Sequence, residues 1–287
     1  MKSSDILEEL FLTLPSKIDQ HSPKTKYYED LKVMVRQKIE EFFTNSSKEP
    51  QNFGPFGKLI FPYHKMGAVN SLNLFDLDEL IIFSFYWANR GRYKYVADIG
   101  ANIGLHSIIL DKCGFEVHSY EPDPEHFKIL ERNLELNNTS KVKAYNSAVS
   151  TKAGQAEFVR VLGNTTGSHL AGSKPESYLY GDLDRFPVEV EAIGPIIAWA
   201  DFLKIDAEGH EKEILLATSA GDWKDTDALV EVGNEDNARH IFDYFNKIGV
   251  NLFAQKINWQ KVNKIEQMPT SYHDGSLFIT SKDKMPW

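Results

Sequence analysis

A glycine-containing turn between an apolar strand and a helix constrains the fold of this chain more than any other feature. Residues 96–104, Val-Ala-Asp-Ile-Gly-Ala-Asn-Ile-Gly, run from apolar residues through Asp98 into a turn with Gly100, Asn102 and Gly104. Glycine permits the backbone conformations of such a turn and lets the backbone approach a ligand closely. The motif therefore predicts an α/β fold with a ligand site at the carboxyl edge of a parallel sheet.

The strand that follows this turn ends in an acidic residue. Residues 115–120, Phe-Glu-Val-His-Ser-Tyr, predict a second strand, and Glu121 stands at its tip. At that position of a parallel sheet, a carboxylate can accept hydrogen bonds from both hydroxyls of a ribose. The glycine spacing differs from the Gly-x-Gly-x-x-Gly of dinucleotide folds, and Asp98 before the turn would repel a diphosphate. S-adenosylmethionine fits these residues, since it carries a ribose, an ammonium and a sulfonium but no phosphate.

A third segment makes a family resemblance visible. Residues 203–211, Leu-Lys-Ile-Asp-Ala-Glu-Gly-His-Glu, place an acidic loop directly after an apolar strand. Together with residues 98–104 and the Tyr-Glu-Pro-Asp of residues 120–123, this segment resembles the signature segments of the FkbM-type methyltransferases. The likeness covers residues 68–281. It implies a class I, Rossmann-like fold with a seven-stranded sheet, S-adenosyl-L-methionine as cofactor, and O-methylation of a sugar, a glycan or a secondary metabolite.

The acidic loop carries the candidate catalytic residues. Methyl transfer requires that the acceptor be aligned with the methyl group and that one proton be accepted. Asp206 and Glu208 are near the strand end and can orient or deprotonate the acceptor, whereas His210 titrates near neutral pH. The two acidic residues can alternatively begin a helix, where negative charge is favourable. Glu231, in the predicted strand 227–232, is a fourth candidate because a buried carboxylate needs a partner.

The candidate cofactor site combines the ends of four predicted strands. Ser147 and Ala148 follow the third strand, where the resemblance implies adenine contacts. Each residue also has a structural alternative, since Asp98 can cap the turn and Asn102 can form it. The candidate cofactor residues are Asp98, Gly100, Asn102, Gly104, Glu121, Pro122, Ser147, Ala148 and Asp206.

Several oxygen-bearing side chains near these strand ends offer an alternative in which a divalent cation assists the reaction. Asp206, Glu231, Asn234 and Asp236 are ligand types that Mg²⁺ accepts, and such a cation can acidify a hydroxyl. No His/Cys cluster has the spacing of a zinc site. We predict no metal.

Composition limits the function classes further. The formal net charge of −9 disfavours a nucleic-acid substrate, because a phosphate backbone requires a basic surface. The single cysteine, Cys113, excludes a disulfide framework within the chain and agrees with a reducing compartment. No apolar run reaches the ~18 residues of a membrane span, and the first ten residues lack a secretory pattern. We expect a cytoplasmic enzyme for a small-molecule or glycan hydroxyl, with a homo-oligomer left open.

The chain divides into an N-terminal helical extension or cap, residues 1–67, and a cofactor-binding domain, residues 68–287. Alternating strands and helices in the second part predict a mostly parallel sheet with helices on both faces. The segments 155–161 and 188–193 alternate with period two and predict an antiparallel ribbon. The loop that joins them, 163–187, is a candidate substrate loop, with disorder as the alternative. The other predicted strands are 94–99, 142–147, 201–206, 251–257 and 276–280, and the last two are expected to pair antiparallel at an edge. Predicted helices are two within 5–45, and 76–89, 104–112, 123–137, 210–218 and 236–248.

Other functions stay open. Transfer to nitrogen or a carboxylate is an alternative, although the Asn/Asp-Pro-Pro-Tyr motif of amide- and base-directed enzymes is absent. A non-catalytic scaffold that binds S-adenosylmethionine is another, which the acidic loop at 206–211 disfavours. A nicotinamide oxidoreductase is disfavoured by the glycine spacing.

Overall fold

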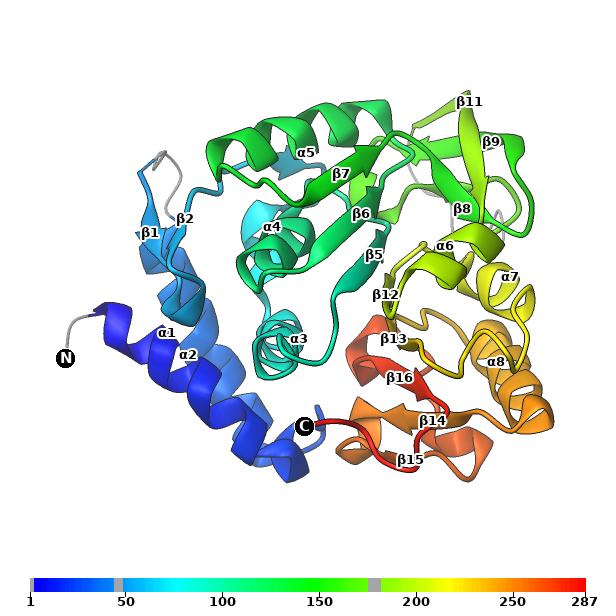
Figure 1. Cartoon of the computed structure of the whole chain (residues 1–287). Helices are drawn as coiled ribbons and strands as arrows, with labels where there is room; N and C mark the ends of the chain where they lie inside the picture. The colour runs from blue at the N-terminus through cyan, green and yellow to red at the C-terminus, as the bar shows by residue number, and fades with distance from the viewer. Residues whose placement is uncertain (1–2, 44–48, 175–181) are drawn as a thin grey trace.

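A mostly parallel eight-stranded sheet is the centre of the computed structural model, which describes residues 3–43, 49–174 and 182–287 (Figure 1). Its strand order is β15-β14-β16-β13-β12-β5-β6-β7, and the strands from β13 to β7 run parallel. This architecture confirms the predicted α/β class. The strands are β5 (Tyr95–Ile99), β6 (Glu116–Tyr120), β7 (Val142–Tyr145), β12 (Phe202–Ile205), β13 (Asp227–Val230), β14 (Asn251–Ala254), β15 (Gln260–Lys261) and β16 (Leu277–Thr280).

The antiparallel edge confirms the expected pairing of the last two predicted strands. β14 and β16 pair antiparallel, and β16 lies between β13 and β14. The sheet has eight strands instead of the seven that the resemblance implied, because β15 adds a two-residue pairing to β14. Both residues of β15 are exposed, so no apolar pattern in the sequence could indicate this strand.

Helices cover both faces of the sheet, as the alternation of elements predicts. One hydrophobic core joins Val96 and Phe202 to α3, α4 and α5. The other core joins Ala97 and Leu203 to α6, α7 and α8. Successive strand residues point to opposite faces, so each core takes alternate residues of the same strands. The helices are α3 (Leu77–Ala88), α4 (Leu105–Lys112), α5 (Pro124–Leu136), α6 (Ile193–Trp199), α7 (Glu211–Leu216) and α8 (Glu235–Ile248).

The N-terminal segment forms two helices, α1 (Ser3–Thr13) and α2 (Lys26–Phe42), that pack on the α3 side of the molecule (Figure 1). The ring of Phe11 lies 5.0 Å from that of Phe56, and the Phe11 carbonyl accepts a hydrogen bond from Ser84 of α3 at 2.9 Å. The segment therefore shares a core with the sheet, and the domain boundary at residue 67 stays a prediction. In the described part of the chain, no helix is long and apolar enough to cross a membrane.

A second sheet is formed by the part of the chain between β7 and α6. It has the order β10-β9-β11-β8 and contains the predicted ribbon, since β9 and β11 pair antiparallel. The predicted loop 163–187 is shorter than expected, because β10 and the first half of β11 lie within it; residues 175–181 fall outside the described residues. The strands are β8 (Ala148–Ser150), β9 (Gly154–Val161), β10 (His169–Leu170) and β11 (Leu183–Ala192).

Candidate functional site

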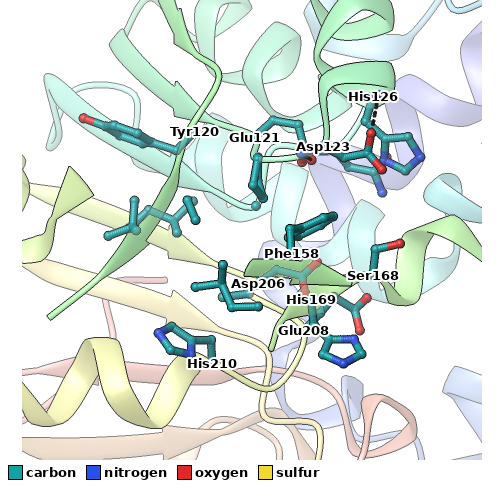
Figure 2. Close-up of a pocket in the computed structure, with 18 of the residues that line it drawn as sticks. Tyr120, Glu121, Asp123, His126, Phe158, Ser168, His169, Asp206, Glu208 and His210 are labelled. Atoms are coloured by element: carbon teal, nitrogen blue, oxygen red, sulfur yellow. Dashed lines mark hydrogen bonds between the residues drawn. The ribbon is translucent and has the colours of Figure 1, made fainter. Parts of the chain in front are cut away.

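A pocket lies between the carboxyl ends of β5, β6 and β12 and the second sheet, and Figure 2 shows its side chains. Nine of the predicted site residues line it: Gly100, Asn102, Glu121, Pro122, Ser147, Ala148, Asp206, Glu208 and His210. Asp98, Gly104 and Glu231 are not among the lining residues. None of the lining residues comes from α1 or α2, so the N-terminal helices do not cap this pocket in the described part of the chain.

The two glycines of the turn are needed for contacts within the protein. Gly100 has φ 78°, and a Cβ there would lie 1.7 Å from the carbonyl oxygen of Asp206. Gly104 has φ 88°, and a Cβ there would lie 3.1 Å from Leu130 of α5. Gly100 thus brings the ends of β5 and β12 together, and Gly104 lets α5 pack on the turn. The sequence suggested that these glycines let the backbone approach a ligand, whereas in the structure they let two parts of the protein approach each other.

Glu121 lines the pocket and is held by two backbone N–H groups. Its Oε2 accepts a hydrogen bond from the backbone N–H of Asn102 and its Oε1 from that of Asp123, both at 2.8 Å. Burial raises the pKa of Glu121 to about 8, although these hydrogen bonds oppose the shift. Each carboxylate oxygen retains a further lone pair, so the side chain can still accept from ligand hydroxyls.

Two buried polar atoms at the pocket have no hydrogen-bond partner among the described residues. They are Oδ1 of Asn102 and Oγ of Ser147. A buried polar atom without a partner costs free energy, and a ligand with complementary polar groups would remove that cost. Both residues belong to the predicted cofactor site, so its side chains fit a polar ligand.

Asp98 lies behind the turn and not in the pocket. It is fully buried, and its Oδ2 accepts a hydrogen bond from Ser107 at 2.7 Å. Its Oδ1 has no hydrogen bond among the described residues and lies 3.9 Å from Nζ of Lys204. Direct contact of Asp98 with a cofactor therefore stays a prediction, and the structure gives it a lysine partner instead.

The acidic loop after β12 is held by Glu211, a role that sequence reasoning missed. The Glu211 Oε1 accepts hydrogen bonds from the backbone N–H groups of Ala207 at 2.9 Å and Gly209 at 3.0 Å. Its Oε2 accepts from the side chain of Asn237 at 2.8 Å. These contacts stabilise a sharp loop in which Glu208 has φ 51° and Gly209 has φ 101°.

The segment after β10 reaches the two candidate bases of this loop. Lys174 donates a hydrogen bond to Glu208, and burial raises the pKa of Glu208 to about 7 while Lys174 opposes that shift. The His210 ring is hydrogen-bonded at both nitrogens, to Ser150 at 2.8 Å and to Ser173 at 2.9 Å, and burial lowers its pKa. His210 is therefore neutral near pH 7 and engaged with two serines, whereas Glu208 can exchange a proton there.

Glu231 lies one residue beyond β13, so its predicted place inside a strand is wrong. β13 ends at Val230, although the Glu231 backbone N–H still donates to Ile205 at 2.9 Å. The negative charge of Asp206, followed by burial, raises the pKa of Glu231 well above its usual value. Glu231 thus interacts electrostatically with the acidic loop but does not line the pocket. Among the described residues, no group of three or more His, Cys, Asp or Glu could hold a metal ion.

The second sheet adds residues that the sequence did not indicate. Arg160 of β9 donates from Nη2 and Nε to the two carboxylate oxygens of Asp123, at 2.6 and 2.7 Å. His126 of α5 is hydrogen-bonded to Thr165 at 2.9 Å, and both residues line the pocket. The ribbon was visible in the sequence, but nothing in its pattern identified these partners, which are far apart along the chain.

Known proteins similar to this chain are methyltransferases. Methyltransferase sdnD of Sordaria araneosa is 26% identical over 168 residues, which cover 48% of this chain and 65% of that protein. Methyltransferase 1 of Beauveria bassiana is 22% identical over 157 residues, 48% of this chain and 63% of that protein. The matches thus span less than two thirds of these relatives.

Solved structures that resemble this chain include further methyltransferases. A precorrin-6y C5,15-methyltransferase from Geobacter metallireducens has a TM-score of 0.38 at 13% identity, covering 67% of this chain and 83% of that one. An O-methyltransferase from Bacillus cereus has a TM-score of 0.35 at 11% identity, covering 69% and 78%. The model of the methyltransferase FkbM domain matches residues 98–251. Because this match covers more than half of the chain and includes all three motifs, the chain belongs to the FkbM methyltransferase family.

Proposed function

We propose that this methyltransferase uses S-adenosyl-L-methionine to methylate a hydroxyl of an uncharged, sugar-containing or other small polar acceptor. The observation that carries the proposal is the meeting of three motifs at one pocket. The glycine turn, Glu121 and the acidic loop 206–210 come from separate strand ends and line the same space.

The residues of the pocket fit this cofactor. Glu121 can accept hydrogen bonds from ribose hydroxyls, while Asn102 and Ser147 offer unpaired polar atoms. Asp206 and Glu208 place negative charge where a cationic ligand is favoured. When bound, S-adenosyl-L-methionine supplies an activated methyl group.

Glu208 is the best-supported proton acceptor. Its carboxylate lines the pocket, and its pKa of about 7 suits a base that works near neutral pH. His210 would first have to release one of its serine partners. Asp206, beside Glu208 in the loop, is left to orient the acceptor.

Charge pairing around the pocket supports an uncharged acceptor. Arg160 is paired with Asp123, and Lys174 with Glu208. In the described part of the chain, these two cations are therefore already paired, and a phosphate or carboxylate on the acceptor would find neither of them free. Hydroxyl groups of Thr165, Thr166 and Ser168 also line the pocket and can bind a polyhydroxy compound.

Two measurements test the proposal. Isothermal titration with S-adenosylhomocysteine should show micromolar binding to the wild type and at least a tenfold loss in Glu121→Ala. Glu189→Ala, on the exposed side of β11, is the matched control and should bind like the wild type. No binding by the wild type would contradict the proposed cofactor.

The second measurement is transfer of a labelled methyl group from S-adenosyl-L-methionine to neutral glycosides, amines and carboxylic acids. Methylation of glycoside hydroxyls is expected. Transfer only to amines or carboxylates would contradict the proposed acceptor class. Cofactor binding without transfer to any class would favour the non-catalytic scaffold.

A further inference from the structure

Lys204 is a charged residue in the middle of the parallel sheet. It lies in β12, between β5 and β13, and is only 8% exposed. Strands in this position are normally apolar on both faces, and the other residues of β12 are fully buried and apolar. A buried ammonium is costly unless it is paired and hydrogen-bonded. The position of Lys204 therefore requires partners of opposite charge.

The partners of Lys204 come from the two motifs that form the pocket. Its Nζ lies 3.3 Å from the carbonyl oxygen of Gly100 and 3.4 Å from Oδ2 of Asp206. It also lies 3.9 Å from Oδ1 of Asp98, the buried oxygen that has no hydrogen bond among the described residues. Gly100 and Asp206 line the pocket, whereas Lys204 stands behind them. The Lys204 ammonium thus links the glycine turn to the acidic loop without lining the pocket itself.

Several carboxyl groups interact electrostatically with Lys204. Burial would lower the pKa of Lys204, but Asp206, Asp98, Glu79 and Glu231 together raise it above its usual value. Glu79 has a second partner in His106, whose Nε2 is 2.8 Å from the Glu79 carboxylate. The ammonium therefore stays charged and is held among carboxylate and carbonyl oxygens. These are also the ligand types that a Mg²⁺ or Ca²⁺ ion would use.

We propose that Lys204 is a positioning residue that serves as the built-in cation of this acidic site. Its ammonium takes the place that a divalent metal would need, and it holds the Asp206 carboxylate and the Gly100 carbonyl in the arrangement that binds the cofactor. The inference rests on the proposed function, because its main readout is cofactor binding. If Lys204 supplies the positive charge, the site requires no divalent metal.

Lys204→Met removes the ammonium and keeps the length of the side chain. We expect at least tenfold weaker binding of S-adenosylhomocysteine and a lower melting temperature, since buried carboxylates lose their counter-charge. Lys212→Met is the matched control, because Lys212 forms a surface ion pair with Asp236 outside the pocket. It should retain the wild-type affinity. Wild-type affinity in Lys204→Met would overturn the inference.

A double variant separates positioning from folding. Asp98→Asn combined with Lys204→Met removes one buried negative charge together with the positive one, so its melting temperature should exceed that of Lys204→Met. Its affinity for S-adenosylhomocysteine should remain at least tenfold below that of Asp98→Asn alone. Equal affinity in the double variant and Asp98→Asn would show that Lys204 only stabilises the fold.

The metal part of the inference is tested on the wild type. Its melting temperature and its affinity for S-adenosylhomocysteine should be the same in EDTA and in excess MgCl₂. An increase with MgCl₂ that EDTA reverses would overturn the claim that Lys204 replaces a metal. Failure of the wild type to bind S-adenosylhomocysteine in either buffer would instead contradict the proposed function.

Discussion

Lys174 and Glu208 form an ion pair that joins the segment after β10 to the acidic loop after β12. The same ammonium donates to the carbonyl of Gly167 at 3.2 Å, so it also holds the preceding turn. The carbonyl oxygen of Ser173 lies so close to Gly209 that a Cβ added to Gly209 would be 2.8 Å from this oxygen. The segment that follows the second sheet's β10 therefore positions Glu208, the proposed base.

Lys174→Met should shift the acid limb of the pH–activity profile to higher pH. The positive charge of Lys174 lowers the pKa of Glu208, so its removal raises that pKa above the present value of about 7. A base must be deprotonated to act, and the active form would then appear only at higher pH. The pH dependence of kcat/KM measures this shift. An unchanged acid limb in a variant that still binds S-adenosylhomocysteine would argue against Glu208 as the base.

In Glu121→Gln, the free energy of unfolding should fall less steeply with rising pH than in the wild type. The pKa of Glu121 is about 8 in the folded protein, against about 4.3 in an unfolded chain. Between these values the folded state binds more protons than the unfolded state, so the free energy of unfolding falls as the pH rises, by up to about 1.4 kcal/mol per pH unit. Urea denaturation from pH 5 to pH 8 should give a flatter profile for Glu121→Gln. Parallel profiles would contradict the raised pKa.

Gly100→Ala should destabilise the fold by about 3 kcal/mol or more. The added Cβ would collide with the Asp206 carbonyl, and φ 78° is unfavourable for alanine. Gly91→Ala is the control, because Gly91 lies in an exposed turn after α3 with nothing within 4 Å of an added Cβ. That change should alter the free energy of unfolding by no more than about 1 kcal/mol. Chemical denaturation compares both variants, and a tolerated Gly100→Ala would argue against the tight contact between β5 and β12.

Glu211→Ala should lower the free energy of unfolding by about 2–4 kcal/mol, because two backbone N–H groups and Asn237 lose their acceptor. Glu213→Ala in the same helix serves as the control and should cost less than about 1 kcal/mol, since its ion pair with Lys212 is partly exposed. Urea denaturation at pH 7 measures both. Similar losses in the two variants would mean that Glu211 does not hold the loop.

The local pattern of the chain was enough to predict the fold class and the principal motifs. Apolar strands alternate with amphipathic helices, and the ends of β5, β6 and β12 carry the glycine turn, Glu121 and the acidic loop. Parallel strands bring their carboxyl ends to one edge, so most of the predicted residues meet at one pocket. The ribbon of β9 and β11 was also predictable, because its period-two alternation is a local feature of the sequence.

The pairing of side chains across the molecule depended on the tertiary structure. Lys204 meets Asp98 only because β12 lies beside β5, and Lys174 meets Glu208 only because the segment after β10 packs against the acidic loop. The order of the strands in a sheet depends on long-range packing, which no local periodicity records. The same packing placed Asp98 behind the pocket and Glu231 beyond its strand. Sequence pattern thus identified most of the residues that line the pocket, whereas three-dimensional packing decided which charges face one another.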